Sequence, residues 1–287
     1  MRIESPQTVD AAVSLLAEER GLARVLAGGT DLIIQMRSGR IEPDLVVDLK
    51  RIPGLREIVE EDGGFRVGAA VSGAELSEHE GVKRLWPGVV EATDLIGSTQ
   101  IQGRATMAGN LCNASPAADA VPALLAAGAT VRIAGPKGER DLPVEEVPTG
   151  PGKTSLDPGE FVTSIFLPAR PAKAADAYLR FIPRTEMDIA VVGAGVYVVF
   201  DEAGTCSAAR VALGAVGPKV MLVEEAANAL IGSTVSDSDL DALAAAASAA
   251  ASPIDDKRGT KEFRTKVAGV IARRAAATAA ERARSSK

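Results

Sequence analysis

The chain has 287 residues, of which 46% are hydrophobic and 24% are charged, and its formal net charge is −6. This composition is typical of a globular protein with one large domain or two to three small ones, and the acidic balance excludes nucleic acid as an expected partner. The sequence contains no apolar run of about 20 residues, so we expect no membrane span. The N-terminus lacks the apolar core of a signal peptide, so we expect a cytoplasmic protein.

Cysteine and histidine are scarce in this sequence. The two cysteines, Cys112 and Cys206, are too few for a disulfide framework or an iron–sulfur cluster. The single histidine, His79, lies among acidic residues, which favours a solvated helix end over a ligand or catalytic role. We therefore expect no metal site, and redox chemistry in this chain would need an organic cofactor.

The first part of the chain alternates between helix and strand. Thr8 is a good N-cap, and the apolar spacing that starts at Val9 predicts a helix that ends near Gly21. A strand over 23–27 then enters the Gly28-Gly29 turn. A short helix over 32–37 and a buried strand over 45–49 follow.

The next part, up to the proline at 168, mixes hairpins with short helices. Gly63-Gly64 and Gly135-Pro136-Lys137-Gly138 predict two hairpins. Helices are expected at 72–78, 88–95 and 121–127, with Pro122 in the first turn of the last one. Residues 160–167 predict a strand, and the prolines of 168–173 suggest a linker after it.

The C-terminal part begins with strand-like runs and ends in helices. The strands are expected at 177–182, 189–200 and 206–213, and the helices at 220–230, at 240–251 and around Phe263. Ser236 and Asp239 form a capping-box pattern before the second of these helices. This order predicts a three-stranded antiparallel sheet plus three helices.

Two segments of small residues stand out as candidates for a binding site. The first segment, 26–32, reads LAGGTDL, and the second segment, 106–119, reads TMAGNLCNASPAAD. Small residues let a backbone approach a ligand closely, and free backbone N–H groups can hold an anion. The alternative is that both segments are tight turns with helix caps, and on a short glycine pattern alone that alternative is favoured.

The motifs AGGTDL, TMAGN and ASPAAD resemble those of the FAD-binding medium subunits of molybdenum hydroxylases, the family of the carbon monoxide dehydrogenase medium subunit and the xanthine dehydrogenase FAD subunit. The resemblance covers nearly the whole chain. It implies an α+β fold with a p-cresol-methylhydroxylase-type FAD-binding domain of two α/β subdomains, 1–55 and 56–170, and a C-terminal flavoprotein domain, 174–287. The family's usual T-I-G-G-N is changed at Met107 and Ala108, and alanine resists the positive φ that glycine allows.

The resemblance also carries cofactor-binding roles to individual positions. The two family loops map onto Val25, Leu26, Ala27, Gly28, Gly29, Thr30, Asp31 and Leu32, and onto Thr106, Met107, Ala108, Gly109 and Asn110. Ser115 and Asp119 belong to the second loop region, Ile96 and Val162 match apolar neighbours of the flavin, and Arg180 matches a cation that would stabilise an anionic reduced ring. No catalytic residue and no metal ligand is expected.

Plainer roles stay open for several of these residues. Asp119 is as good a candidate for a helix cap as for a nucleotide contact, and Val162 fits ordinary strand core. Arg180 would also be explained by an ion pair with Glu186 or Asp188. The run DDKRGTKEFR over 255–264 matches a C-terminal motif of the family, and we expect it to define the fold or to face another subunit.

The function implied by the resemblance is electron transfer within a complex. FAD would be held non-covalently by this chain. A large molybdopterin subunit would oxidise the substrate, a small subunit with [2Fe-2S] clusters would pass on the electrons, and the flavin would deliver them to an external acceptor. The complex would be a dimer of heterotrimers. Two alternatives are a stand-alone FAD oxidoreductase and a flavin-free assembly module, the second motivated by Met107 and Ala108.

Overall fold

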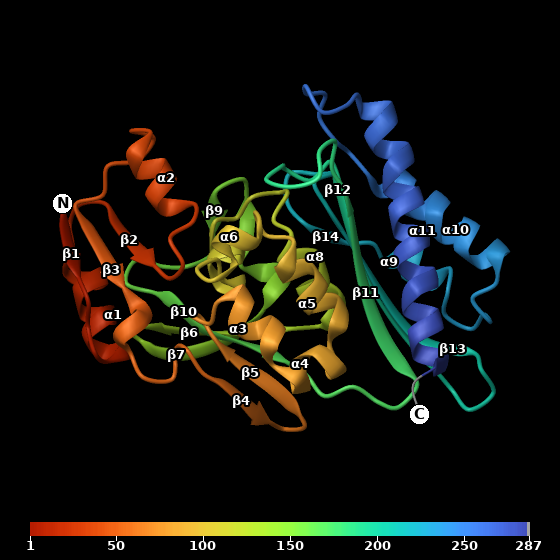
Figure 1. Cartoon of the computed structure of the whole chain (residues 1–287), viewed down its shortest axis with the longest axis horizontal. Coiled ribbons are helices and arrows are strands. Elements are labelled where there is room, and N and C mark those ends of the chain that lie inside the picture. Colours follow the sequence, from red (N-terminus) through yellow and green to blue (C-terminus); the bar gives the residue numbers. More distant parts are fainter. Residues whose placement is uncertain (286–287) are drawn as a thin grey trace.

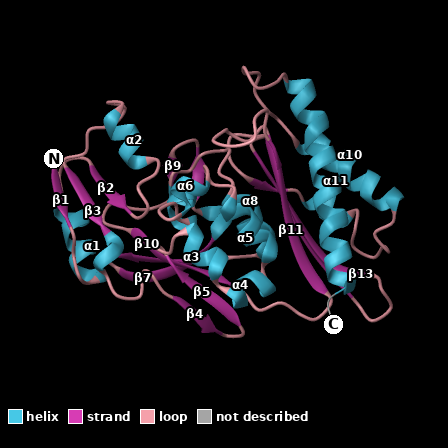
Figure 2. Ribbon diagram, in the orientation of Figure 1, coloured by secondary structure: helices cyan, strands magenta, loops and turns pink. Residues whose placement is uncertain are grey.

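The structure is a computed structural model that describes residues 1–285. Its three main sheets follow one another along the long axis of the molecule, with the N-terminal part at one end and the C-terminal helices at the other (Figure 1). Short helices fill the space between the second and third sheets (Figure 2). No helix within residues 1–285 has both the length and the apolar character needed to cross a membrane.

The N-terminal part is a small parallel sheet with the strand order β1-β3-β2. Its elements are β1 (Arg2–Glu4), α1 (Val9–Glu18), β2 (Ala23–Leu26), α2 (Leu32–Arg37), β3 (Leu45–Asp48) and the 3-10 turn η1 (Leu49–Arg51). Thr8 caps α1 as expected, because its hydroxyl accepts the N–H of Ala11 at 3.2 Å. β1 was not expected, since three residues at a chain end form a strand only through their pairing with β3.

The middle part is an antiparallel sheet with the order β4-β5-β10-β6-β7. Its strands are β4 (Ile58–Glu61), β5 (Gly64–Gly68), β6 (Thr130–Gly135), β7 (Gly138–Pro143) and β10 (Phe161–Leu167), with a small hairpin of β8 (Pro148–Gly150) and β9 (Lys153–Thr154). Its helices are α3 (Gly73–Glu78), α4 (Glu80–Leu85), α5 (Pro87–Asp94), α6 (Thr99–Gln102), α7 (Met107–Cys112), α8 (Ala120–Ala127) and η2 (Val144–Glu146). Every residue of α8 is buried, so this helix forms the centre of the core.

The C-terminal part contains a four-stranded sheet, so the expected three strands were one too few. The strands are β11 (Ala174–Phe181), β12 (Val192–Phe200), β13 (Cys206–Gly214) and β14 (Met221–Leu222). The apolar run at 220–223 pairs with β13 instead of starting a helix, because this pairing buries its side chains against the sheet. The helices are α9 (Glu224–Asn228), α10 (Asp237–Ala250) and α11 (Lys261–Ser285).

The C-terminal sheet lies between two layers of helix. α8 contacts β12 and β13, while α11 contacts β11 and β12 (Figure 1). Trp86 marks the junction between the middle and C-terminal parts: its indole N–H donates to the carbonyl of Pro168 at 2.9 Å, and its ring lies 5.3 Å from the ring of Tyr197 on β12. The middle part and the C-terminal sheet are therefore packed against each other.

Candidate functional site

The first segment, 26–32, connects β2 to α2. Its backbone lies against Arg104 and Ala105, which lead into the second segment. A Cβ atom on Gly28 would lie 1.9 Å from the carbonyl oxygen of Arg104, so only glycine fits there. Gly29 has a φ of +79°, a conformation that side chains rarely adopt. These two glycines let residues 27–31 pass directly against the chain that leads into Thr106.

Side chains also fasten the first segment to its neighbours. The Lys50 ammonium donates to the carbonyl of Ala27 at 3.1 Å and to Asp48 at 2.7 Å. Gln35 on α2 donates to the side-chain oxygen of Asn113, just after α7, at 3.1 Å. The first segment and the residues around the second segment thus lie against each other.

The start of the second segment is a helix, where the sequence suggested only a loop. Thr106 caps α7, because its hydroxyl accepts the N–H of Gly109 at 2.9 Å. Met107 and Ala108 are 3% and 5% exposed and form the first turn of α7, and Ala108 does not have a positive φ. The change from the family's glycine to Ala108 therefore causes no backbone strain here.

The polar side chains of the second segment are used as local caps. The Asn110 side-chain oxygen accepts the N–H of Ala120 at 3.0 Å, at the start of α8, and the Ser115 hydroxyl accepts the N–H of Ala117 at 3.2 Å. In contrast, the Thr30 side chain makes no hydrogen bond to any other residue in 1–285. Thr30 is thus the one of these neutral polar groups that has its full hydrogen-bonding capacity left for a ligand.

Asp119 does not cap α8 with its side chain, although it stands at the N-cap position. Its carboxylate instead accepts from the Arg180 guanidinium at 2.9 Å and from the Tyr178 hydroxyl at 3.3 Å. Arg180 and Asp119 are nearly enclosed, with side chains 5% and 11% exposed. The expected alternative partners of Arg180 were wrong, since Asp188 pairs with Arg184 and Arg258.

The environment of Asp119 disturbs its ionisation. Burial raises its pKa to about 6, against the opposing effects of the positive charge and hydrogen bond of Arg180 and of the hydrogen bond from Tyr178. Burial also raises the pKa of Tyr178 well above its usual value, so the phenol stays protonated and donates. The group is therefore a buried carboxylate held by one cation and one neutral donor.

Tyr178 was missed by the sequence analysis, although a signal for it exists. Residues two apart on a strand point to the same face, so a role for Arg180 on β11 implies that Tyr178 points the same way. The structure places both side chains on Asp119.

The two apolar candidates are buried, and Cys112 of the second segment is partly buried. Ile96 is 7% exposed, and Val162 is 4% exposed beside a bulge in β10. Both belong to the hydrophobic core around α8. Burial raises the pKa of Cys112 to about 12, so this thiol remains protonated and unreactive.

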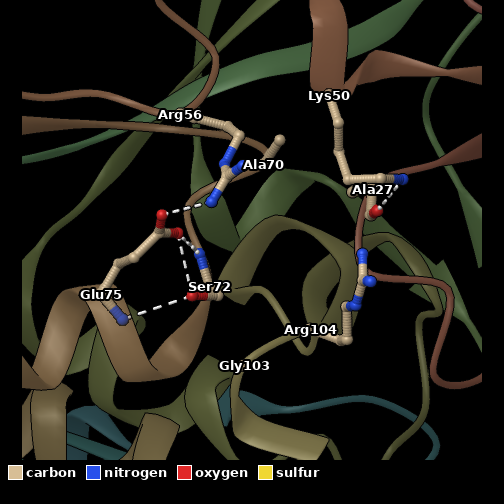
Figure 3. Close-up of a pocket in the computed structure, with 8 residues that line it drawn as sticks. All are labelled: Ala27, Lys50, Arg56, Ala70, Ser72, Glu75, Gly103 and Arg104. Carbon is tan, nitrogen blue, oxygen red and sulfur yellow. Dashed lines mark hydrogen bonds and ion pairs between the residues drawn. The ribbon is translucent and has the colours of Figure 1, made fainter.

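A shallow pocket of about 290 Å³ adjoins the first segment on the side of α3. Its lining consists of Ala27, Lys50, Arg56, Ala70, Ser72, Glu75, Gly103 and Arg104 (Figure 3). Arg56 pairs with Glu75 at 2.5 Å, and the Arg104 side chain points toward Ala27 and Lys50 (Figure 3). Ala27 alone among the predicted cofactor-binding residues lines this pocket, so it borders the predicted site without containing it.

The site residues fit a dinucleotide held by backbone groups. Gly28 and Gly29 leave backbone without side chains in the first segment, and in the second segment the Asp119 side chain keeps 11% of its surface exposed. Metal ligation is not built into this region, because no group of three or more His, Cys, Asp or Glu within residues 1–285 is arranged to hold a metal ion.

Comparison with known proteins gives matches over nearly the entire chain. Residues 1–170 match the family model for the FAD binding domain in molybdopterin dehydrogenase, and residues 177–279 match the CO dehydrogenase flavoprotein C-terminal domain. The chain is 34% identical to the carbon monoxide dehydrogenase medium chain of Afipia carboxidovorans, over 97% of this chain and 96% of that one. It is 33% identical to the 6-hydroxypseudooxynicotine dehydrogenase complex subunit alpha of Paenarthrobacter nicotinovorans, over 98% and 94%.

The fold agrees with the same group of proteins. A crystal structure of the Cu,Mo-CO dehydrogenase contains a chain that superposes with a TM-score of 0.93 at 33% identity, covering 98% of both chains.

Proposed function

Because the chain belongs to the family of FAD-binding medium subunits of molybdenum hydroxylases, we propose that it is the electron-transfer subunit of a heterotrimeric dehydrogenase. It takes electrons from the [2Fe-2S] clusters of a small partner subunit and passes them to an external acceptor. A large molybdopterin subunit selects and oxidises the substrate. The observation that carries this proposal is the close contact of Gly28 with the backbone of Arg104 and Ala105, which lead into the second family segment, in a chain that matches the family over both domains.

FAD would be held by the two segments, 26–32 and 106–119, together with Arg180 of the C-terminal sheet. Backbone N–H groups of Gly28, Gly29 and Thr30 would hold its phosphates, and Asp119, held by Arg180, would accept a hydrogen bond from the nucleotide. When bound, FAD supplies the redox chemistry, since a flavin exchanges electrons singly or in pairs. The protein holds it without a covalent link and shapes its electrostatic surroundings.

We also propose the domain division that the family implies. The FAD-binding domain is of the p-cresol-methylhydroxylase type, with subdomains 1–55 and 56–170, and the flavoprotein domain spans 174–287. The three sheets occupy these ranges separately, which supports the division. Relatives named as a complex subunit and as a medium chain support assembly with partners, and the complex is a dimer of heterotrimers in the cytoplasm.

The flavin-free alternative has lost its motivation. It depended on Met107 and Ala108, and both residues are buried in the regular first turn of α7. The stand-alone oxidoreductase would need a substrate site with acid–base groups, and the charged groups at the pocket near Ala27 are held mainly in the pairs Lys50–Asp48 and Arg56–Glu75.

The proposal is tested by the visible absorption of the purified chain, alone and with its partners. We expect equimolar, acid-releasable FAD in both preparations and iron–sulfur absorption only with the partners. The substrate of the complex should reduce the flavin only when the partners are present. Substrate turnover by the isolated chain would instead establish the stand-alone enzyme, and a colourless chain in an active complex would establish the assembly module.

A further inference from the structure

Tyr178 lies outside both cofactor segments, yet its side chain ends at the site. It is 2% exposed, and its hydroxyl lies 3.3 Å from Oδ1 of Asp119. Space for this hydroxyl comes from Gly193 on β12, where a Cβ atom would lie 2.6 Å from the Tyr178 oxygen. The glycine thus permits the phenol to reach the carboxylate.

The two donors on β11 bind different oxygens of the Asp119 carboxylate. Tyr178 donates to Oδ1 of Asp119 and Arg180 donates to Oδ2, at 2.9 Å. An ionised carboxylate has about four acceptor positions, so two donors fix its orientation and leave each oxygen able to accept once more. The side chain of Asp119 keeps 11% of its surface exposed, which leaves room for such an acceptance.

We propose that Tyr178 is a positioning residue: its hydroxyl fixes the Asp119 carboxylate so that this carboxylate accepts a hydrogen bond from a hydroxyl or N–H group of the bound flavin nucleotide. This inference rests on the proposed function, because it requires that the chain binds FAD. It assigns Tyr178 an effect on the cofactor that passes through Asp119, without contact between the phenol and the flavin.

The charged and polar groups around Asp119 come from a few elements. β11 supplies Arg180 and Tyr178, whereas α7 supplies only the neutral Asn110, which is bonded to Ala120. On α5, Glu91 accepts the backbone N–H of Tyr178 at 3.4 Å, and on β13 Arg210 binds the Leu125 carbonyl, toward the far end of α8. Among residues 1–285, Arg180 and Tyr178 are therefore the groups that oppose the effect of burial on Asp119.

The direction of the effect follows from these contacts. Burial has raised the pKa of Asp119 to about 6, and the hydrogen bond from Tyr178 lowers it. Removing the hydroxyl raises this pKa further, so a larger share of Asp119 is protonated near neutral pH. A protonated carboxyl accepts hydrogen bonds poorly, and FAD affinity should fall with it.

The experiment measures the dissociation constant of FAD from the full-length chain between pH 5 and pH 8.5. For the native chain we expect affinity to fall as the pH drops through about 6. Tyr178→Phe should move this inflection upward by about one pH unit, the size expected for a hydrogen bond to a charged group. The matched control is Tyr197→Phe, since Tyr197 is the only other tyrosine of the chain and packs on Trp86, and its inflection should stay in place.

A second variant separates the inference from the proposed function. Asp119→Asn should bind FAD weakly and without an inflection. An unmoved inflection in Tyr178→Phe, an equal shift in both tyrosine variants, or native affinity in Asp119→Asn would each overturn the inference while FAD binding stands. Absence of FAD binding by the native chain and by Tyr197→Phe at every pH would overturn the proposed function itself.

Discussion

The two segments that form the candidate site have similar compositions but different structures. The first segment is a turn in which Gly28 packs directly against the backbone of Arg104. Its Thr30 side chain makes no hydrogen bond within residues 1–285. In the second segment the side chains of Thr106, Asn110 and Ser115 all accept backbone N–H groups of their own neighbourhood.

This difference shows how similar residues divide two tasks. Thr106, Asn110 and Ser115 of the second segment use their side chains in local hydrogen bonds at and between the starts of α7 and α8, so they provide rigidity. The first segment leaves its polar groups open, so it provides capacity to bind. Substitutions at these three capping residues should therefore change the free energy of unfolding, whereas those in the open turn should change cofactor affinity, and the close contact at Gly28 should affect both.

The largest effect is expected from Gly28→Val. The new side chain would collide with the Arg104 carbonyl and force the two segments apart, which should lower the free energy of unfolding by about 3 kcal/mol or more and abolish FAD binding. Thermal unfolding and flavin content measure the two effects. Gly103→Ala is the matched control, because a Cβ atom there meets nothing within 4 Å. Equal behaviour of the two variants would show that the contact at Gly28 is unimportant.

Arg180→Met comes next, because its effect on stability is expected to reach that size only at high pH. It leaves Asp119 buried without its cation, so the pKa of Asp119, already raised to about 6, rises further. A raised pKa means that stability is present when the carboxyl is protonated and is lost as the pH rises through that pKa. We therefore expect a loss of about 3 kcal/mol at pH 8 and a clearly smaller loss at pH 5.

Denaturant unfolding at the two pH values measures this dependence. The control is Arg184→Met, whose side chain is 69% exposed and whose partner Asp188 keeps Arg258, so it should change stability by less than about 0.5 kcal/mol. A loss in Arg180→Met that is the same at both pH values would contradict the ionisation argument.

The smallest effects come from a pair of single polar groups. Asn110→Ala removes the cap of α8 and should cost about 1 kcal/mol of stability. Thr30→Ala should leave stability unchanged and weaken FAD binding by about two- to ten-fold, the value of one hydrogen bond. Thermal unfolding and FAD titration of both variants give the comparison directly. A stability loss in Thr30→Ala equal to that in Asn110→Ala would remove the distinction between the segments.

Features set by neighbouring residues were predictable from the sequence. The caps at Thr8 and at Ser236 with Asp239 are present, because each depends on only three or four consecutive positions. The assignment of the two small-residue segments to one candidate site followed from the family motifs, whereas their different structures did not. Ala108 looked unfavourable because a loop was assumed, and its helical conformation depends on Thr106 closing the first turn of α7.

Features set by distant residues were not predictable in this way. The pair of Asp119 and Arg180 joins α8 to β11 across 61 positions, and nearby acids such as Asp188 looked like better partners. β14 likewise exists only because β13 lies beside it. A contact across 61 positions, or a strand of two residues, leaves little trace in local composition, so only the folded chain reveals it.

Trp86 gives this chain a built-in optical probe. It is the only tryptophan, and it lies between the Pro168 carbonyl, the Tyr197 ring and the Arg170 guanidinium, 5.8 Å from its ring. The emission wavelength of an indole depends on its exposure to water. Tryptophan fluorescence of the whole chain therefore reports on the surroundings of Trp86 alone. Separation of the C-terminal sheet from the FAD-like domain would therefore be visible as a red shift, without a label and before either part unfolds.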